Sequence, residues 1–470
     1  MPIRITFRTE SIHVIFRAFL FLITFLVMPV EPAAAQRPVP LQVTTRADAL
    51  LQDLVKRQLF QGAVVIAHGE KVSYSAGFGF ADRERAVPFT PDTPTDTASI
   101  AKTFTAAGLL LLAAEGRVDL ESPVRNLLPT FPHAATRVRH LLAHSAGLPD
   151  YEWFDKRVAP SEPRTNAVHL AVIAKELPSP AFPPGTAFAY DNVAYDVAAM
   201  VIERVTGTTF AEFIDTRFSR PLDLQAFVRP ARFSDWSGVR TRGYRRTAGG
   251  WADHDAHDLE GFYGADNIYL SAKALQRWAA GHGRLMGARL REAVTSARLD
   301  DGRATGLTLG SWYASADGSR RYYTGHHNGF YSVAYVDDAR DLSFAWVAND
   351  APPAWIQTGL TRALVAIAEG RAPEALMAPP AADVEDPTGR YQVPSIGEVV
   401  VLRGEGKTLR VRQGGVVYDA FRVARGVHYV PGLDANLRFG ADAAGKVTLS
   451  WHSVFVVAQA IAREPAPVRQ

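Results

Sequence analysis

Short apolar runs in the first part of the chain predict strands, and a longer apolar run predicts a helix. Residues 62–67 are apolar, and residues 71–79 form a second β-rich run after a turn that contains glycine, which predicts a β-hairpin. Residues 99–115 are apolar at most positions and end before Gly116, which predicts a buried helix. The pattern therefore indicates a globular domain with both a sheet and helices.

Helical patterns dominate the middle of the chain, and strand patterns return after it. Further helices are predicted at residues 139–144, 168–176, 193–206, 272–282 and 354–369. Residues 331–336 and 342–347 are rich in β-branched and aromatic side chains, so we expect two more strands there. Strands before and after a helical region predict an α+β fold, in which helices lie beside an antiparallel sheet.

The C-terminal part has its own pattern. Residues 371–387 are rich in proline and alanine, which predicts a linker. Short strands separated by turns are predicted beyond it, at residues 398–402, 408–412, 416–421, 436–439 and 447–451. This spacing is typical of a small all-β barrel or sandwich. We therefore expect one domain over residues 36–370 and an antiparallel β domain over residues 388–470.

The first residues have the features of an export signal. Arginines precede an apolar run at residues 18–28, and three alanines at residues 33–35 offer a small-x-small cleavage pattern before Gln36. The run is too short to span a bilayer as a helix. We expect a signal peptide at residues 1–35, a periplasmic or secreted protein, and no stable membrane span after cleavage. An uncleaved membrane anchor is the alternative interpretation.

Composition narrows the possible functions. The chain has 470 residues with a formal net charge of +3, and its basic residues form no dense block that would indicate a nucleic-acid partner. Hydrophobic content of 47% and charged content of 21% fit a globular protein. The chain has no cysteine, which excludes disulfides, thiolate zinc sites and a cysteine nucleophile.

Ser99 and Lys102 form the only Ser-x-x-Lys pattern in the chain, at the start of the predicted helix 99–115. Positions i and i+3 face the same side of a helix, so the hydroxyl and the amine can reach hydrogen-bond distance, as an activated nucleophile requires. Free N–H groups at the helix N-terminus suit a developing oxyanion. Taken alone, the pattern also fits a capping serine and a solvated lysine.

A second candidate group is Tyr190 with Asn192, on a loop before the predicted helix 193–206. A phenol beside a nucleophile can act as a base if a nearby cation lowers its pKa. Asn192 can position Lys102 or a substrate amide. Taken alone, this group also fits a packed aromatic residue beside a helix cap.

The two patterns resemble the sequence boxes of the serine β-lactamase and penicillin-binding-protein group, in particular its class C-like branch. That branch also includes esterases, D-aminopeptidases and DD-carboxypeptidases. The similarity covers about residues 45–370 and is carried by residues 60–65, 97–105, 140–148, 182–185, 205–207 and 221–222. It implies an antiparallel sheet flanked by helices, a helical subdomain, Ser99, Lys102 and Tyr190 as catalytic residues, and no metal or organic cofactor.

The third box of this group, commonly Lys-Thr-Gly or His-x-Gly, departs from the pattern. The ungapped alignment places Tyr323, Thr324 and Gly325 there, and implies that the backbone N–H of His326 joins that of Ser99 in the oxyanion hole. A rival alignment uses residues 327–329, which keeps the His-x-Gly letters. We prefer the first alignment because it needs no gap.

A tyrosine in the third box has a consequence for the substrate. A neutral phenol is a poor partner for a substrate carboxylate, so Tyr323 favours an esterase or a D-amino-acid peptidase over an efficient β-lactamase. His326 or His327 could supply a substitute charge that depends on pH.

Other candidate motifs are weaker. Residues 143–147 resemble a loose nucleophile elbow around Ser145, but no strand is predicted before them. His140 and His144 have helical spacing, and residues 254–258 contain two histidines and two aspartates, but neither group has a His-Glu-x-x-His pattern. We interpret these histidines as structural or surface residues.

The sequence thus predicts an acyl-transfer hydrolase for a small-molecule ester, amide, lactam or peptide. Ser99 would attack the carbonyl, Tyr190 and Lys102 would share the proton transfer, and water would release the acyl group. The alternative is a non-catalytic or sensory protein on the same scaffold that retains a peptide or cell-wall ligand. The sequence does not indicate an oligomeric state.

Overall fold

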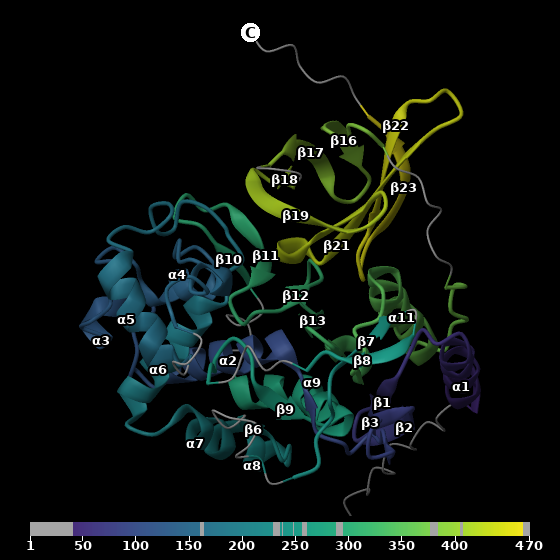
Figure 1. Ribbon diagram of the computed structural model, residues 1–470, viewed down its shortest axis with the longest axis horizontal. Helices are drawn as coiled ribbons and strands as arrows, with labels where there is room; N and C mark the ends of the chain where they lie inside the picture. Colours follow the sequence, from purple (N-terminus) through teal and green to yellow (C-terminus); the bar gives the residue numbers. More distant parts are fainter. Residues whose placement is uncertain are drawn as a thin grey trace, which may run out of the picture. The chain divides into compact units, whose positions relative to one another are not determined.

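The computed structural model (Figure 1) describes residues 41–159, 164–228, 236, 238–247, 249–255, 261–287, 295–376, 384–404 and 408–463. The expected signal peptide, and two of the residues weighed as metal ligands, His257 and Asp258, lie outside the described residues. Within those described ranges, no helix combines the length and the apolar character needed to cross a bilayer.

A six-stranded antiparallel sheet forms the centre of the first domain, in the order β12-β13-β14-β15-β1-β2. Its strands are β1 (Gly62–His68), β2 (Lys71–Phe78), β12 (Tyr313–Ala314), β13 (Arg320–His327), β14 (Phe330–Asp337) and β15 (Leu342–Ala348). The predicted hairpin is confirmed as β1 and β2, and the two predicted later strands as β14 and β15. Strand β1 pairs with β15, so segments far apart in the sequence lie side by side within the sheet.

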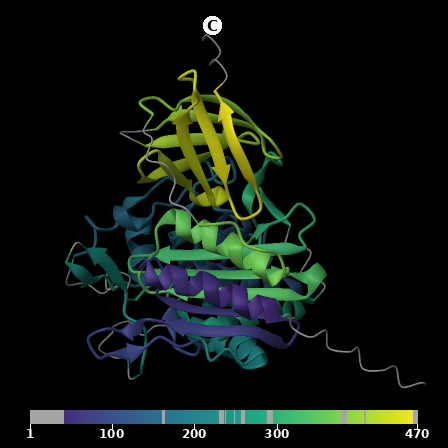
Figure 2. The ribbon, with the colours of Figure 1, turned by 90° about the vertical axis from the view of Figure 1, so that its right-hand side faces the viewer.

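Helices cover both faces of this sheet, which explains why β1, β14 and β15 are buried along nearly their whole length. On one face lie α1 (Leu41–Lys56) and α11 (Ala354–Ala368), which contact each other and cross the sheet in Figure 2. On the other face lies α9 (Ala272–Met286), which packs on β1, β14 and β15.

The helical region lies beside the sheet, to the left in Figure 1. Its α-helices are α2 (Ala101–Ala114), α3 (Val124–Leu127), α4 (Val138–Leu142), α5 (Asn166–Glu176), α6 (Val193–Thr206), α7 (Phe210–Ile214) and α8 (Arg220–Leu222), with short turns η1 (Ala98–Ile100), η2 (Tyr151–Trp153) and η3 (Asp215–Ser219). Helix α2 is buried on nearly every side, as its sequence predicts, and packs on α6. The predicted helices 193–206 and 272–282 are confirmed as α6 and α9.

Minor sheets join these layers. They are β5-β9-β6 (Thr95–Asp96, Ile268–Leu270, Phe227–Val228), β3-β4 (Phe80–Asp82, Val87–Pro88), β7-β8 (Tyr244–Thr247, Gly250–Asp253) and β10-β11 (Ser296–Arg298, Ala304–Thr308). Strand β5 precedes η1 directly, so the three-stranded sheet anchors the segment that leads to Ser99.

The C-terminal strands form a nearly closed antiparallel barrel, in which the last strand returns to the first. They are β16 (Gly389–Val393), β17 (Gly397–Arg403), β18 (Leu409–Gln413), β19 (Val416–Ala424), β20 (Val427–Val430), β21 (Ala435–Ala441), β22 (Val447–His452) and β23 (Val457–Ala462), with a turn η8 (Pro431–Leu433) before β21. The α+β prediction with a small all-β domain is therefore confirmed.

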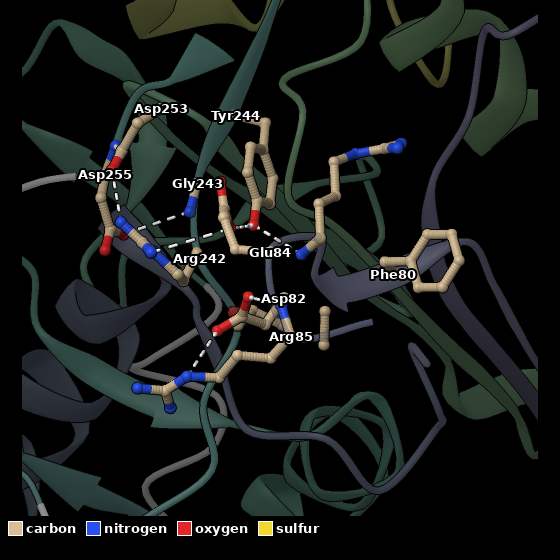
Figure 3. A network of polar contacts seen from close by, with 12 residues as sticks. Phe80, Asp82, Glu84, Arg85, Arg242, Gly243, Tyr244, Asp253 and Asp255 are labelled. Carbon is tan, nitrogen blue, oxygen red and sulfur yellow. Dashed lines mark hydrogen bonds and ion pairs between the residues drawn. The ribbon is translucent and has the colours of Figure 1, made fainter. Parts of the chain in front are cut away.

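A polar network fixes the loop after β3 to strand β7 (Figure 3). The Tyr244 hydroxyl donates a 2.7 Å hydrogen bond to Glu84 and accepts one of 2.7 Å from the Arg83 backbone N–H. Asp255 accepts from the Gly243 backbone N–H at 3.1 Å and pairs with Arg240 at 2.7 Å. Asp255 therefore has a structural role, and in the described part of the chain no three His, Asp or Glu side chains cluster as metal ligands.

His282 gives the fold a measurable pH dependence. Burial lowers the pKa of His282 to about 3, and its ring stacks on Trp312. As the pH falls below about 6.5, His282 is protonated in the unfolded state, whereas in the native state it stays neutral until about pH 3. The native state therefore loses stability on acidification. Between pH 7 and 5 this histidine is expected to cost about 2 kcal/mol of unfolding free energy. In the variant His282→Phe, the unfolding free energy measured with urea should fall by about 2 kcal/mol less between pH 7 and pH 5 than in the wild type. An equal fall in both proteins would contradict a buried, neutral His282.

Candidate active site

Ser99 lies in the turn η1, directly before α2. Ala98 has a φ of +47°, a left-handed conformation that costs free energy for a residue with a β-carbon. The Asp96 carboxylate accepts a 2.8 Å hydrogen bond from the Ala98 backbone N–H and holds this conformation in place. The turn leaves Ser99 partly exposed at the wall of a cavity.

Lys102 is fully buried beside Ser99, which rules out a solvated surface lysine. Its Nζ donates to Ser99 Oγ at 2.9 Å, to Asn192 Oδ1 at 2.7 Å and to the Ala265 carbonyl at 3.1 Å. Three acceptors surround the Nζ atom, so the buried amine has a fixed position. The predicted contacts of Lys102 with Ser99, three residues earlier, and with Asn192 are thus both present.

Tyr190 completes the group around the Ser99 hydroxyl. Its hydroxyl hydrogen-bonds Ser99 and lies 3.1 Å from the Tyr323 hydroxyl, and Lys102 Nζ lies 5.2 Å from the centre of its ring. Burial raises the pKa of Tyr190 above its usual value, against the opposing effect of its bonds to Ser99 and Tyr323. The sequence analysis made a role of Tyr190 as a base conditional on a lowered pKa, and this condition is not met because desolvation of the phenolate raises the pKa. Tyr190 is a neutral phenol at neutral pH.

His144 supports Tyr190 from behind. The two rings stack with centroids 4.5 Å apart, and His144 Nδ1 accepts a 3.1 Å hydrogen bond from the Asp191 backbone N–H. Burial and, to a smaller degree, Lys102 lower the pKa of His144 to about 3, so its ring is neutral. Ser145 is completely buried, which argues against a nucleophile elbow there. His140 hydrogen-bonds Asp300 at 3.1 Å, and so both histidines are structural.

An acidic group beside Ser99 was missed by the sequence analysis. Ser99 Oγ donates to Asp266 Oδ1 at 3.5 Å, and the Tyr151 hydroxyl lies 3.4 Å from Asp266 Oδ2 and 3.3 Å from Asp196 Oδ1. Asp266 lies in the segment before β9 that also supplies the Ala265 carbonyl to Lys102. No sequence motif marks this segment. Its one signal is Gly264, where a β-carbon would lie 2.4 Å from the Tyr195 carbonyl oxygen.

Strand β13 places the third box against the nucleophile turn. A β-carbon on Gly325 would lie 2.0 Å from the Thr97 carbonyl oxygen, so only glycine allows the strand to come this close. Thr324 and His326 line the cavity, and Tyr323 is buried with its hydroxyl on Tyr190. The rival register at residues 327–329 lies at the turn from β13 to β14. An oxyanion role for the His326 N–H stays a prediction.

The cavity at Ser99 has a volume of about 560 Å³. One group of its lining side chains is acidic and comprises Asp150, Glu152, Asp155 and Asp266. Another group comes from the barrel and includes Tyr418, Asp419, Phe421, Val423 and Tyr429. The nucleophile candidate therefore opens into a cleft built by both parts of the chain.

Sequence comparison now places the chain among known proteins. A family model described as Beta-lactamase matches residues 47–369, which is more than half of the chain. The chain belongs to the beta-lactamase family. Penicillin-binding protein 4* of Bacillus subtilis (strain 168) is 33% identical over 173 residues, which are 37% of this chain and 38% of that protein. The alignment thus spans well under two thirds of that relative.

Solved structures share the beta-lactamase-family fold with this chain. The crystal structure of SurE aligns with a TM-score of 0.59 and 22% identity over 90% of this chain and 99% of that chain. D-amino acid amidase from Ochrobactrum anthropi SV3, complexed with L-phenylalanine, aligns with a TM-score of 0.53 and 22% identity over 65% of this chain and 91% of that chain. The SurE alignment covers more than the family region, so the fold similarity extends into the barrel.

The arrangement in this beta-lactamase-family chain suits nucleophilic chemistry. Ser99 has an amine and a phenol at its hydroxyl, and it opens into a cavity large enough for a small substrate. The three side chains come from the turn η1, from α2 and from the loop before α6, and the sequence analysis had named all three.

Proposed function

We propose that this chain is an exported serine hydrolase that acts through an acyl-enzyme at Ser99 on an ester or amide carbonyl. The observation that carries the proposal is the 2.9 Å contact between Lys102 Nζ and Ser99 Oγ, with Tyr190 on the same hydroxyl. Family membership supports it, because the family is one of serine hydrolases. Export to the periplasm or the medium rests on the signal-like pattern of residues 1–35.

The contacts suggest a division of labour in the reaction. In the reacting form of the site, Lys102 carries a free amine. Ser99 Oγ attacks the carbonyl carbon while its proton passes to that amine, and the backbone N–H groups of Ser99 and His326 hold the oxyanion. Tyr190 donates its phenolic proton to the leaving oxygen or nitrogen and regains a proton from the Lys102 ammonium, so both groups return to their starting states. Water then attacks the acyl-enzyme along the same route and releases the acid.

The charge around the cavity favours substrates without a carboxylate near the reacting carbonyl. The lining includes five acidic side chains, and the lining arginine, Arg164, pairs with Asp155 at 2.8 Å. Tyr323 supplies no positive charge in the third box. A β-lactam with a carboxylate would meet like charges here, whereas a neutral ester or an amide with a protonated amine would not. We therefore propose an esterase or D-amino-acid peptidase activity over efficient β-lactamase activity.

A substrate panel tests this preference. The kcat/KM for p-nitrophenyl esters or D-amino acid amides is expected to exceed that for nitrocefin by roughly 100-fold, because like-charge contacts cost several kcal/mol. Turnover is measured for all three classes with one enzyme preparation. Comparable or better turnover of nitrocefin would contradict the proposed preference.

Covalent labelling separates an enzyme from a sensory protein that only retains a ligand. Incubation with a fluorophosphonate is expected to add one label per chain, on the peptide that contains Ser99. Intact mass and peptide mapping provide the measurement. A chain that binds the panel substrates but takes no label and releases no product would support the non-catalytic alternative.

A further inference from the structure

Strand β19 turns one face of the barrel toward the cavity that holds Ser99. Successive side chains of a strand point to opposite faces, and along β19 the buried side chains are those of Val416, Tyr418 and Ala420. The other set comprises Asp419, Phe421 and Val423, which are exposed and all line the cavity. The outer face of this strand is therefore part of the substrate cleft.

That face carries large apolar side chains that are exposed to solvent. Phe421 and Val423 are 50% and 44% exposed, and few large apolar side chains in the described part of the chain are open to this degree. Tyr429 lies directly opposite Phe421 on β20 and also lines the cavity. Asp419 pairs with Arg410 at 3.4 Å. The part of the wall without a charged group is thus Phe421, Val423 and Tyr429, whose hydroxyl donates a 2.8 Å hydrogen bond to Asp434.

The barrel holds this wall in a fixed place next to the first domain. The turn η8 packs on the first domain, where the Tyr313 hydroxyl donates to the Pro431 carbonyl. The rings of Phe188 and Tyr418 lie with centroids 5.1 Å apart across the same boundary. Residues 40–470 form one compact unit, so the apolar wall exists before a substrate arrives.

Ring contacts and hydroxyl contacts also link the barrel side of the cavity to Tyr190, one of the proposed proton-transfer groups. The Tyr313 ring stacks on Tyr323 with centroids 5.4 Å apart, and the Tyr323 hydroxyl lies 3.1 Å from that of Tyr190. Phe188, which touches the barrel, precedes Tyr190 by two residues. Ser99 and the outer face of β19 line the same cavity, so a substrate whose carbonyl lies at Ser99 can extend one substituent toward β19.

We propose that the outer face of β19, with Phe421, Val423 and Tyr429, is an apolar subsite, and that the enzyme selects esters or amides carrying an aliphatic or aromatic substituent beside the reacting carbonyl. The proposal rests on the proposed function for its reaction, but its binding part does not need turnover. Removal of this apolar surface from water stabilises the bound substrate and its transition state.

The double variant Phe421→Ser/Val423→Ser tests the subsite. One substrate series compares p-nitrophenyl octanoate with p-nitrophenyl acetate, and the other compares 4-butylphenyl acetate with phenyl acetate. The ratio of kcat/KM for the long member to that for the short member is expected to fall about tenfold in the series whose apolar group reaches β19. The first series places that group on the acyl side, and the second places it on the leaving side.

A matched control removes the same residue types elsewhere. Phe80 on β3 and Val72 on β2 are 41% and 48% exposed and do not line the cavity. In Phe80→Ser/Val72→Ser both ratios are expected to stay within twofold of wild type. Fluorophosphonate labelling of Ser99 in each variant checks that the nucleophile is intact.

The outcomes separate the subsite from the proposed function. Ratios that are unchanged in both series, or an equal loss for every substrate in the test variant, overturn the subsite and leave the hydrolase in place. If the wild type takes no label and hydrolyses no substrate, the proposed hydrolase function is wrong. The subsite is then tested by measuring the binding of octanamide by calorimetry. Its Kd is expected to rise about tenfold in the test variant and not in the control, and an equal Kd overturns the subsite.

Discussion

Ser99→Ala is expected to lower kcat on activated esters by roughly 10⁴-fold or more, because it removes the atom that forms the acyl-enzyme. Ser99 is partly exposed in a turn, and its hydroxyl is the common partner of Lys102 and Tyr190. The loss of one oxygen at this position leaves the packing of α2 unchanged. Steady-state rates with p-nitrophenyl acetate, at enzyme concentrations that reveal the residual rate, provide the measurement.

The matched control is Ser145→Ala, at the serine of the rejected nucleophile elbow. Ser145 is buried, and its hydroxyl bonds the His140 carbonyl at 3.4 Å. This variant is expected to retain ester turnover within a few-fold and to take the fluorophosphonate label. Full activity of Ser99→Ala together with inactivation by Ser145→Ala would reverse the assignment of the nucleophile.

Lys102→Met is expected to reduce kcat by roughly 10³-fold, in the range of a lost acid–base group, while KM changes little. Methionine keeps the length of the side chain and removes the amine that touches Ser99 Oγ and Asn192 Oδ1. The double variant with Ser99→Ala should be no slower than Ser99→Ala alone, since residues that act as one unit are not additive. Rates of the two single variants and the double variant test this.

Lys273→Met controls for the loss of a positive charge. Lys273 lies on α9 and pairs with Asp92 at 2.7 Å near the surface, away from the cavity. Its replacement is expected to leave kcat within twofold of wild type. Near wild-type activity of Lys102→Met, with its fold preserved by circular dichroism, would show that the amine is not needed for turnover.

The sequence predicted the elements with strong periodicity and the three side chains at the nucleophile. Helix α6 has the bounds that its apolar spacing predicts, and α2 and the β1–β2 hairpin were also found. Helix α1 was overlooked although Val43, Ala47, Leu51 and Leu54 form a buried stripe at helical spacing. Strand β20 is only four residues long, which leaves too few alternating positions to recognise.

The rest of the site depends on tertiary contacts that no local pattern encodes. Asp266 and Tyr151 reach Ser99 and its neighbours from segments far away in the sequence. The pKa of Tyr190 could not be predicted from the presence of Lys102, because the depth of burial decides which effect dominates. The apolar face of β19 could not be predicted from the sequence either. An exposed Phe421 indicates a binding surface only once the structure places it at the cavity.

The pairing of β1 with β15 also governs when this protein can fold. These two neighbouring strands are separated by most of the first domain, and β15 ends only at Ala348. A ribosome must therefore release the chain through Ala348 before this sheet can close, and such long-range pairing is slow. Late closure of the sheet is compatible with the proposed export, in which the unfolded chain would pass through a translocation channel.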